Sequence, residues 1–276
     1  MIFNASKEQI MAKVNADKKY KGAVFFDIDG TLIEIVKGIY VPPASAKEAI
    51  AKLRENGYLT GIATGRAEAY IPELGLELDC IISCNGAALT KDGQTVLSRT
   101  MPYETLSEII KYLKENKCPF VLETTKNCYY SGAEERYFSW ISKDFYPLDD
   151  CEEEIKNFET IKICAFYKPE ILPDLKNRFG EKVYVIAHRH NPFADIGALG
   201  VSKGAAIIKA IETFGIDISN TYAFGDDNND FEMLSAVAHG VAMTPHAPAL
   251  EDVAEYVTGS VAEDGIYNAL LHYKLI

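Results

Sequence analysis

Short hydrophobic runs alternate with amphipathic segments along the first 83 residues. Three of these runs have the length and continuity of strands buried in a parallel sheet, namely residues 23–26 (AVFF), 58–63 (YLTGIA) and 80–83 (CIIS). Residues 45–57 predict a helix between the first two runs. Ser45 would be its N-cap, Glu48 would complete a capping box and Gly57 would follow the last turn. Strands separated by helices indicate a parallel sheet wound with right-handed crossovers.

The same alternation returns towards the C-terminus. Residues 202–215 predict a helix that begins after Ser202 as its N-cap and ends at Gly215. Further short hydrophobic strands are predicted at residues 221–224, 240–243 and 256–258. The two ends of the chain therefore look like parts of one α/β core.

The middle of the chain has a different pattern, with many aromatic residues and longer β-rich runs. A helix is predicted at residues 103–117, and β-rich runs cover residues 120–130 and 161–167. We interpret residues 87–190 as an α+β domain inserted into a discontinuous core made of residues 1–86 and 191–276. The predicted fold class is α/β, a Rossmann-like parallel-sheet core with an inserted α+β domain.

Composition narrows the possible partners and location. The 276 residues carry a net charge of −12, which argues against nucleic acid as a partner, because such binding rests on basic surface. No hydrophobic run is long enough to cross a membrane, and the first 22 residues lack the hydrophobic centre of a secretory signal. We therefore expect a cytoplasmic protein that does not bind membranes. Its oligomeric state is left open between a monomer and a small homo-oligomer.

Polar side chains follow several of the predicted strands at the point where each strand ends. They are Asp27 and Asp29, then Thr64, Gly65 and Arg66, then Asn85, and finally the acidic run from Asp226 to Asp230, while Lys203 opens the late helix. The carboxyl ends of parallel strands meet at one edge of a sheet, so these groups should converge there. Carboxylates in such a place suit Mg²⁺, which prefers oxygen ligands and also binds substrate phosphate.

Four of these segments resemble, in order, the motifs of the haloacid dehalogenase superfamily. They are DIDGT at residues 27–31, ATGR at 63–66, SKG at 202–204 and GDDNND at 225–230. The segments ISCNGA (82–87) and EDVAEYVTGSVAEDGI (251–266) resemble the Cof-type phosphatases more narrowly. In that branch a large α+β cap of type IIB is inserted after the third strand. The resemblance covers residues 23–86 and 191–268, whereas the inserted domain is similar only in size and position.

The resemblance implies a role for each motif residue. Asp27 would be the nucleophile that forms an aspartyl-phosphate, and Asp29 would be the general acid and then the general base. Mg²⁺ would be held by the Asp27 carboxylate, the Asp29 carbonyl oxygen and Asp226. Asp230 would either support the metal or orient the lysine.

Further motif residues would bind the phosphoryl group. Thr64 and Lys203 would bind its oxygens, and Asn229 would contact phosphate. Asp227 stands where relatives often carry a small residue, so it could be either a ligand or a solvated bystander.

Three further assignments stay open at the level of sequence. Arg66, next to Gly65, could contact the substrate or pin its own loop. Asn85 could bind phosphate or serve the turn that it forms with Gly86. The aromatic stretch 129–146, which includes Arg136 and Trp140, could line the substrate site or form the core of the inserted domain.

The predicted function is a Mg²⁺-dependent phosphatase that hydrolyses small phosphorylated metabolites, with sugar phosphates as the leading class. A phosphomutase with the same core is the first alternative, and it would need sugar-binding arginines in the inserted domain. Arginine is sparse there, since only Arg99, Arg136, Arg178 and Arg189 occur, which favours the phosphatase. A non-catalytic module that binds a phosphorylated metabolite is the second alternative. Loss of Asp27 or Asp29 would have favoured it, and both residues are present.

Overall fold

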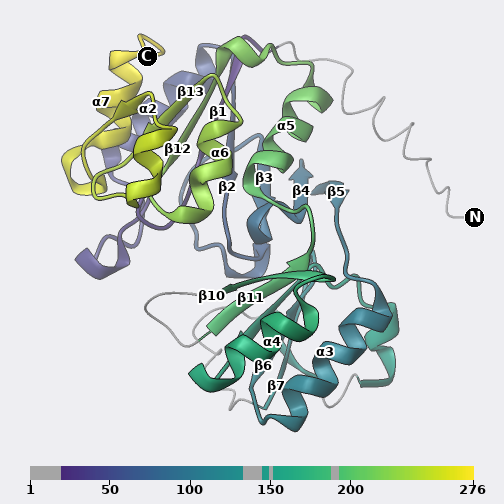
Figure 1. The fold of residues 1–276 in the computed structure, drawn as a ribbon. Helices are drawn as coiled ribbons and strands as arrows, with labels where there is room; N and C mark the ends of the chain where they lie inside the picture. The colour runs from purple at the N-terminus through teal and green to yellow at the C-terminus, as the bar shows by residue number, and fades with distance from the viewer. Residues whose placement is uncertain (1–19, 133–144, 149–151, 188–192) are drawn as a thin grey trace, which may run out of the picture. The chain divides into compact units, whose positions relative to one another are not determined.

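A computed structural model of the protein describes residues 20–132, 145–148, 152–187 and 193–276 (Figure 1). The chain divides into two compact units. The core unit comprises the residues up to Gly65, Pro72–Val96 and Ser202–Ile276, and the insertion unit comprises Arg66–Ile71 and Leu97–Val201. Among the described residues, no helix combines the length and hydrophobicity that a passage through a bilayer would require.

An eight-stranded sheet forms the centre of the core unit. Its order is β14 (Tyr256–Val257), β13 (His239–Ala242), β12 (Thr221–Gly225), β1 (Gly22–Phe26), β2 (Tyr58–Ala63), β3 (Cys80–Ser83), β4 (Ala88–Lys91) and β5 (Gln94–Ser98). The first six strands of that order pair in parallel, and β4 pairs with β3 in the antiparallel direction. The six strands predicted for the core are confirmed.

The order of the strands determines which face of the sheet each connecting helix covers. The described helices of the core unit are α2 (Ala44–Glu55), α5 (Lys203–Phe214), α6 (Phe231–Ser235) and α7 (Gly265–His272). From β1 the chain steps through α2 to β2, whereas from β12 it steps through α6 to β13 on the other side of β1. Right-handed crossovers in opposite directions put α2 and α6 on opposite faces of the sheet. This reversal at β1 and β12 is where parallel sheets bind ligands.

Strand β1 is completely buried because helices cover both faces of the sheet. All of its residues from Ala23 to Phe26 have no exposed surface, which explains why it reads as a continuous hydrophobic run. Phe26 stacks on Phe224 of the neighbouring strand β12, with ring centroids 5.1 Å apart. The two strands that precede Asp27 and Asp226 are thus locked together by packing.

Of the two predicted helix N-caps, one is correct and the other is wrong. Ser202 caps α5 as expected, because its hydroxyl accepts a hydrogen bond from the Ala205 N–H at 3.1 Å. Ser45 does not cap α2, which begins one residue earlier after Pro43 and has no side-chain cap. The Ser45 hydroxyl donates to Asp264 instead, and Glu48 pairs with Lys52 rather than completing a capping box.

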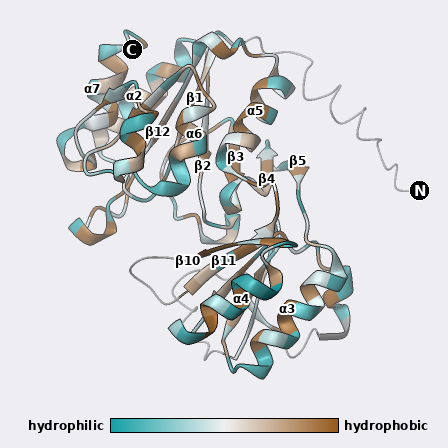
Figure 2. Ribbon diagram, in the orientation of Figure 1, coloured by the Kyte–Doolittle hydropathy of each residue, from teal (hydrophilic) through white to brown (hydrophobic). Residues whose placement is uncertain are grey.

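A six-stranded sheet forms the centre of the insertion unit. Its order is β10 (Val183–Ala187), β11 (Phe193–Ala198), β9 (Lys162–Phe166), β6 (Phe120–Glu123), β7 (Cys128–Ser131) and β8 (Phe145–Pro147). The helices α3 (Tyr103–Glu115) and α4 (Leu172–Phe179) belong to the same unit. Helix α3 buries Leu106, Ile109, Ile110 and Leu113 along one side and presents hydrophilic residues on the other (Figure 2). The predicted α+β character of the insertion is confirmed.

The strands at the two junctions differ from the expected assignment. Strands β4 and β5 lie after residue 87 but extend the core sheet, because β4 folds back on β3. Strand β11 lies after residue 190 but pairs with β9 and β10. A hydrophobic pattern identifies a strand but carries no information about which sheet it joins.

The aromatic stretch of the insertion is partly described. Tyr129 packs against the hydrophobic core of the unit and stacks on Phe158 at 4.0 Å between ring centroids. This supports the interpretation of Tyr129 as a core residue. Arg136 and Trp140 lie outside the described residues.

Short turns of 3-10 type connect the longer elements. They lie at Ile35–Lys37, Glu68–Tyr70, Cys84–Gly86, Glu152–Asn157, Pro169–Ile171, Ile218–Asn220, Asn228–Asp230, Pro248–Asp252 and Val261–Glu263.

The caps give a first prediction. We expect Ser202→Ala to lower the free energy of unfolding by about 1 kcal/mol, because it removes an N-cap acceptor. Ser45→Ala, the matched control, should change it by less than about 0.5 kcal/mol, since Ser45 caps no helix. Urea denaturation of both variants measures the difference. Equal losses would contradict the capping geometry.

Candidate active site

Most of the polar residues predicted to converge follow strands of the core sheet, and Lys203 is the first residue of α5. Asp27 follows β1, Thr64 follows β2, the turn Cys84–Gly86 follows β3 and Asp226 follows β12. Since these four strands are parallel, their carboxyl ends share one edge of the sheet.

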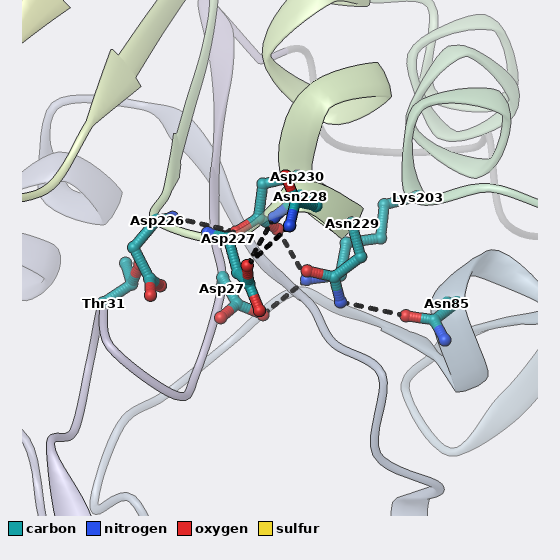
Figure 3. A network of polar contacts seen from close by, with 9 residues as sticks. All are labelled: Asp27, Thr31, Asn85, Lys203, Asp226, Asp227, Asn228, Asn229 and Asp230. Atoms are coloured by element: carbon teal, nitrogen blue, oxygen red, sulfur yellow. Dashed lines mark hydrogen bonds and ion pairs between the residues drawn. The ribbon is translucent and has the colours of Figure 1, made fainter. Parts of the chain in front are cut away.

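Lys203 lies at the centre of this edge (Figure 3). Its ammonium Nζ is 2.6 Å from Oδ1 of Asp27 and 2.6 Å from Oδ1 of Asp230, and the residue is 1% exposed. Burial alone would lower the pKa of Lys203, but the negative charges of Asp230 and Asp27 outweigh it and raise that pKa above its usual value. The lysine is therefore a fixed positive charge that joins β1 to the loop after β12.

Three carboxylates surround this lysine closely enough to share a cation. Asp27, Asp226 and Asp230 each offer an oxygen within 4.8 Å of the others, and they form the group among the described residues that could hold a metal ion. Burial, together with the neighbouring carboxylates, raises the pKa of Asp27 to about 7 and that of Asp226 to about 9, although Lys203 opposes the shift. One ammonium does not neutralise three carboxylates, of which Asp27 and Asp230 are buried and Asp226 is half-buried. The donor set fits a hard divalent cation such as Mg²⁺.

Asp226 is held from two sides by residues of the loop after β1. Gly30 has a φ of +90°, and a Cβ atom at that position would lie 2.2 Å from Oδ2 of Asp226. The Thr31 hydroxyl donates to Oδ1 of Asp226 at 3.2 Å. Sequence reasoning gave Thr31 no role, although its place in the DIDGT segment was a signal that it acts with the aspartates.

Asp230 and Asp227 organise the loop after β12. Oδ2 of Asp230 accepts from the backbone N–H groups of Asp226 and Asp227 at 2.9 and 3.1 Å. Oδ1 of Asp227 accepts from the Asn228 N–H at 2.7 Å. Asp227 is exposed and lies outside the three-carboxylate group, so the structure gives it a capping role that the sequence had not suggested.

Asp29 lies beside the site but outside the carboxylate group. It is exposed, its backbone bridges to Ile33, and the buried Ile28 separates it from Asp27. Burial and Asp230 raise the pKa of Asp27 the most, and the charge of Asp29 adds to this shift. The Asp29 side chain thus keeps access to solvent while Asp27 does not.

The remaining predicted residues divide between the two units. Thr64 is buried in the core unit, and its carbonyl accepts from the Asn85 N–H at 2.9 Å. The Asn229 amide Nδ2 donates to Oδ1 of Asn85 at 3.2 Å. Arg66 belongs to the insertion unit, where its guanidinium Nη1 donates to the Tyr70 carbonyl at 3.0 Å, in keeping with a loop-pinning role.

Comparison with known proteins agrees with this geometry. Residues 24–270 match the model of a family described as haloacid dehalogenase-like hydrolase. The chain belongs to this family. Its fold, with a core and an inserted cap domain, matches solved structures of the haloacid dehalogenase superfamily, and the chain is a phosphoric monoester phosphatase of this group.

Relatives cover the chain over most of its length. YkrA of Bacillus subtilis (strain 168) is 30% identical over 267 residues, which is 92% of this chain and 98% of YkrA. A second relative from the same organism is YcsE, a 5-amino-6-(5-phospho-D-ribitylamino)uracil phosphatase. It is 25% identical to this chain, and the match covers 91% of this chain and 95% of YcsE. Among solved structures, that of the subclass IIB sugar phosphatase BT4131 matches with a TM-score of 0.79. Its sequence is 28% identical to this one, and the match covers 92% of this chain and 100% of the BT4131 chain.

The contact between Gly30 and Asp226 gives a second prediction. We expect Gly30→Ala to lower phosphatase activity by about 100-fold or more, because the added methyl group would displace the Asp226 carboxylate. The Mg²⁺ concentration needed for half-maximal activity should rise as well.

Gly38→Ala is the matched control for this substitution. Gly38 also has a positive φ, +76°, but nothing lies within 4 Å of its missing Cβ. Both variants should lose about 1 kcal/mol of stability from backbone strain, while only Gly30→Ala loses activity. Comparable activity in the two variants would show that Gly30 does not make room for Asp226.

Proposed function

We propose that the protein is a Mg²⁺-dependent phosphatase of small phosphorylated metabolites, with sugar phosphates as the leading class, and that it acts through an aspartyl-phosphate on Asp27. The observation that carries this proposal is the buried Lys203 ammonium, which is 2.6 Å from carboxylate oxygens of both Asp27 and Asp230. Asp27 is thereby fixed at the end of a rigid, buried strand, as a nucleophile requires.

Asp27 and Asp29 would divide the chemistry according to their different exposure. An oxygen of the buried Asp27 forms a bond to phosphorus while the ester P–O bond of the substrate breaks. The exposed Asp29 gives its proton to the departing alcohol. It then takes a proton from the water that attacks phosphorus, and the Asp27 carboxylate is released. Access to solvent suits Asp29 to this exchange of protons.

Of the other carboxylates, Asp226 would hold the metal and Asp230 would orient the lysine. Mg²⁺, held by Asp27, Asp226 and the Asp29 carbonyl oxygen, would supply the positive charge that allows a carboxylate and a phosphate to meet. Asp230 already uses one oxygen for Lys203 and the other for two backbone N–H groups. It is therefore better placed to orient Lys203 than to coordinate the metal directly.

Thr64 and Lys203 would bind the phosphoryl oxygens. Lys203 is the first residue of α5, so its side chain and the N-terminus of the helix both present positive charge. Thr64 directly follows β2, which is buried from Leu59 to Ala63, and is itself buried. Two groups on rigid elements can stabilise the charge that shifts to phosphoryl oxygens in the transition state without being rearranged.

The substrate class rests on the names of relatives. YcsE is named for a phosphorylated ribityl compound, and BT4131 is described as a sugar phosphatase. We extend to this chain the class that these names share, a small phosphorylated polyol or sugar.

The third prediction tests the nucleophile. Asp27→Asn should lower the hydrolysis of p-nitrophenyl phosphate by about 10³-fold or more, because an amide does not attack phosphorus. Asp92→Asn is a matched control in the exposed turn between β4 and β5, and it should keep wild-type activity. Measurable turnover of Asp27→Asn near the wild-type rate would rule out Asp27 as the nucleophile.

The fourth prediction tests the metal. EDTA should abolish the activity of the wild type, and an excess of Mg²⁺ should restore it, because three closely spaced carboxylates need a cation before they accept an anionic substrate. Full activity in EDTA would contradict a metal-dependent mechanism.

The same assay separates the phosphatase from its alternatives. A wild type that binds Mg²⁺ and phosphate but does not hydrolyse the aryl phosphate would mean that the inserted domain rejects the aryl substrate, or that the protein is a phosphomutase or a binding module. Transfer of a phosphoryl group from a sugar bisphosphate would then identify the mutase. Without transfer, hydrolysis of a panel of phosphorylated metabolites would separate a selective phosphatase from a binding module.

A further inference from the structure

The turn after β3 has a left-handed backbone conformation that residues other than glycine rarely adopt. Cys84, Asn85 and Gly86 follow one another with φ values of +50°, +57° and +98°. Only glycine adopts such values freely, and asparagine tolerates them better than other residues. The two non-glycine residues, Cys84 and Asn85, therefore store strain, which persists only where the surrounding structure requires it.

Contacts of this turn reach three segments that are far apart in the sequence. The Asn85 N–H donates to the Thr64 carbonyl at 2.9 Å, and Oδ1 of Asn85 accepts from Nδ2 of Asn229 at 3.2 Å (Figure 3). A Cβ atom on Gly86 would lie 2.1 Å from the carbonyl oxygen of Ser202, the residue before Lys203. The turn thus touches the neighbourhoods of Thr64, Lys203 and Asn229.

The Asn85 side chain is enclosed within this arrangement. It is 6% exposed, and its Oδ1 is 3.0 Å from the position that a Cβ atom on Gly65 would occupy. Its side-chain carbonyl oxygen accepts a hydrogen bond from the Asn229 amide. These contacts join Asn85 to residues on two other segments of the site.

We propose that Asn85 is a positioning residue that fixes Asn229 relative to Thr64, so that both face the phosphoryl group in one geometry. This inference rests on the proposed function, because it assumes that Asn229 and Thr64 contact the phosphoryl group. The left-handed backbone of Asn85 directs its N–H to the Thr64 carbonyl and its side-chain carbonyl to Asn229. The strain in the turn is the consequence of making both hydrogen bonds from one residue.

Asn85→Gly tests the side chain without disturbing the backbone. Glycine adopts the left-handed conformation freely, so the variant keeps the turn and loses only the side-chain amide. We expect it to lower kcat/KM by about tenfold, the effect of one lost positioning hydrogen bond. In an Asn229→Ala background the same substitution should change kcat/KM by less than about twofold, because nothing is left to position.

A second readout does not need turnover. The Kd of inorganic phosphate, measured by calorimetry with Mg²⁺ present, should rise on Asn85→Gly in the wild type and stay unchanged in the Asn229→Ala background. If the protein proves to have no phosphatase activity, this phosphate cycle still tests the positioning role separately from the proposed function.

Asp92 provides the matched control for backbone strain. It has a φ of +50° in an exposed turn, so Asp92→Gly should alter stability in the same sense as Asn85→Gly. The Asp92→Gly variant should keep wild-type kcat/KM and phosphate affinity.

Two results would overturn the inference. Equal losses from Asn85→Gly with and without Asn229 would mean that Asn85 acts on the ligand independently. No loss in the wild-type background would mean that the Asn85 amide positions nothing that the reaction uses. The coupled result, in which the loss depends on Asn229, is the one that a purely structural role would not produce.

Discussion

The buried ion pairs of Lys203 are the interaction on which the rest of the site depends. They connect the end of β1, the first residue of α5 and the loop after β12, which are far apart in the sequence. Removing two charges from water costs several kcal/mol per ion, and this cost is offset only where the geometry is good and the remaining hydrogen bonds are made. Asp230 meets that condition, because its second oxygen accepts two backbone N–H groups. The lysine therefore specifies one arrangement of three elements.

The backbone packs closely around the carboxylates of the site and helps to hold them in this arrangement. A Cβ atom on Gly225 would lie 2.5 Å from Cγ of Asp230, just as one on Gly30 would collide with Asp226. The two glycines are needed here for space, because three carboxylates come within 4.8 Å of one another. Backbone that approaches so closely leaves the acidic groups little freedom to move apart, so their repulsion has to be met by positive charge.

Much of this arrangement could be predicted from the sequence, since it follows from where strands end. Hydrophobic runs located the core strands, and the polar residues after them were correctly expected to meet at one edge, as the hydrogen bonds of Lys203 and Asn85 confirm. The cap of α2 was predicted wrongly because Ser45 finds a partner in Asp264, 219 residues away. The assignment of β4, β5 and β11 to their sheets is a local matter, because β4 pairs with its neighbour β3 and β11 with its neighbour β10, and the hydrophobic pattern does not specify these pairings. The support of Asp226 by Thr31 again depends on a contact between distant segments, 195 residues apart. Local patterns do not encode such contacts.

The charge of the site explains why we propose a metal in addition to the lysine. A phosphate ester is an anion, and the protein as a whole carries a net charge of −12. Lys203 faces three carboxylates, and burial raises the pKa of Asp27 and Asp226 because the charged forms are unfavourable there. The divalent cation that we propose among the same oxygens would offset that penalty, favour the ionised form of Asp27 and attract an anionic substrate. The acidity that would repel an anion would thus bind the cation that attracts it.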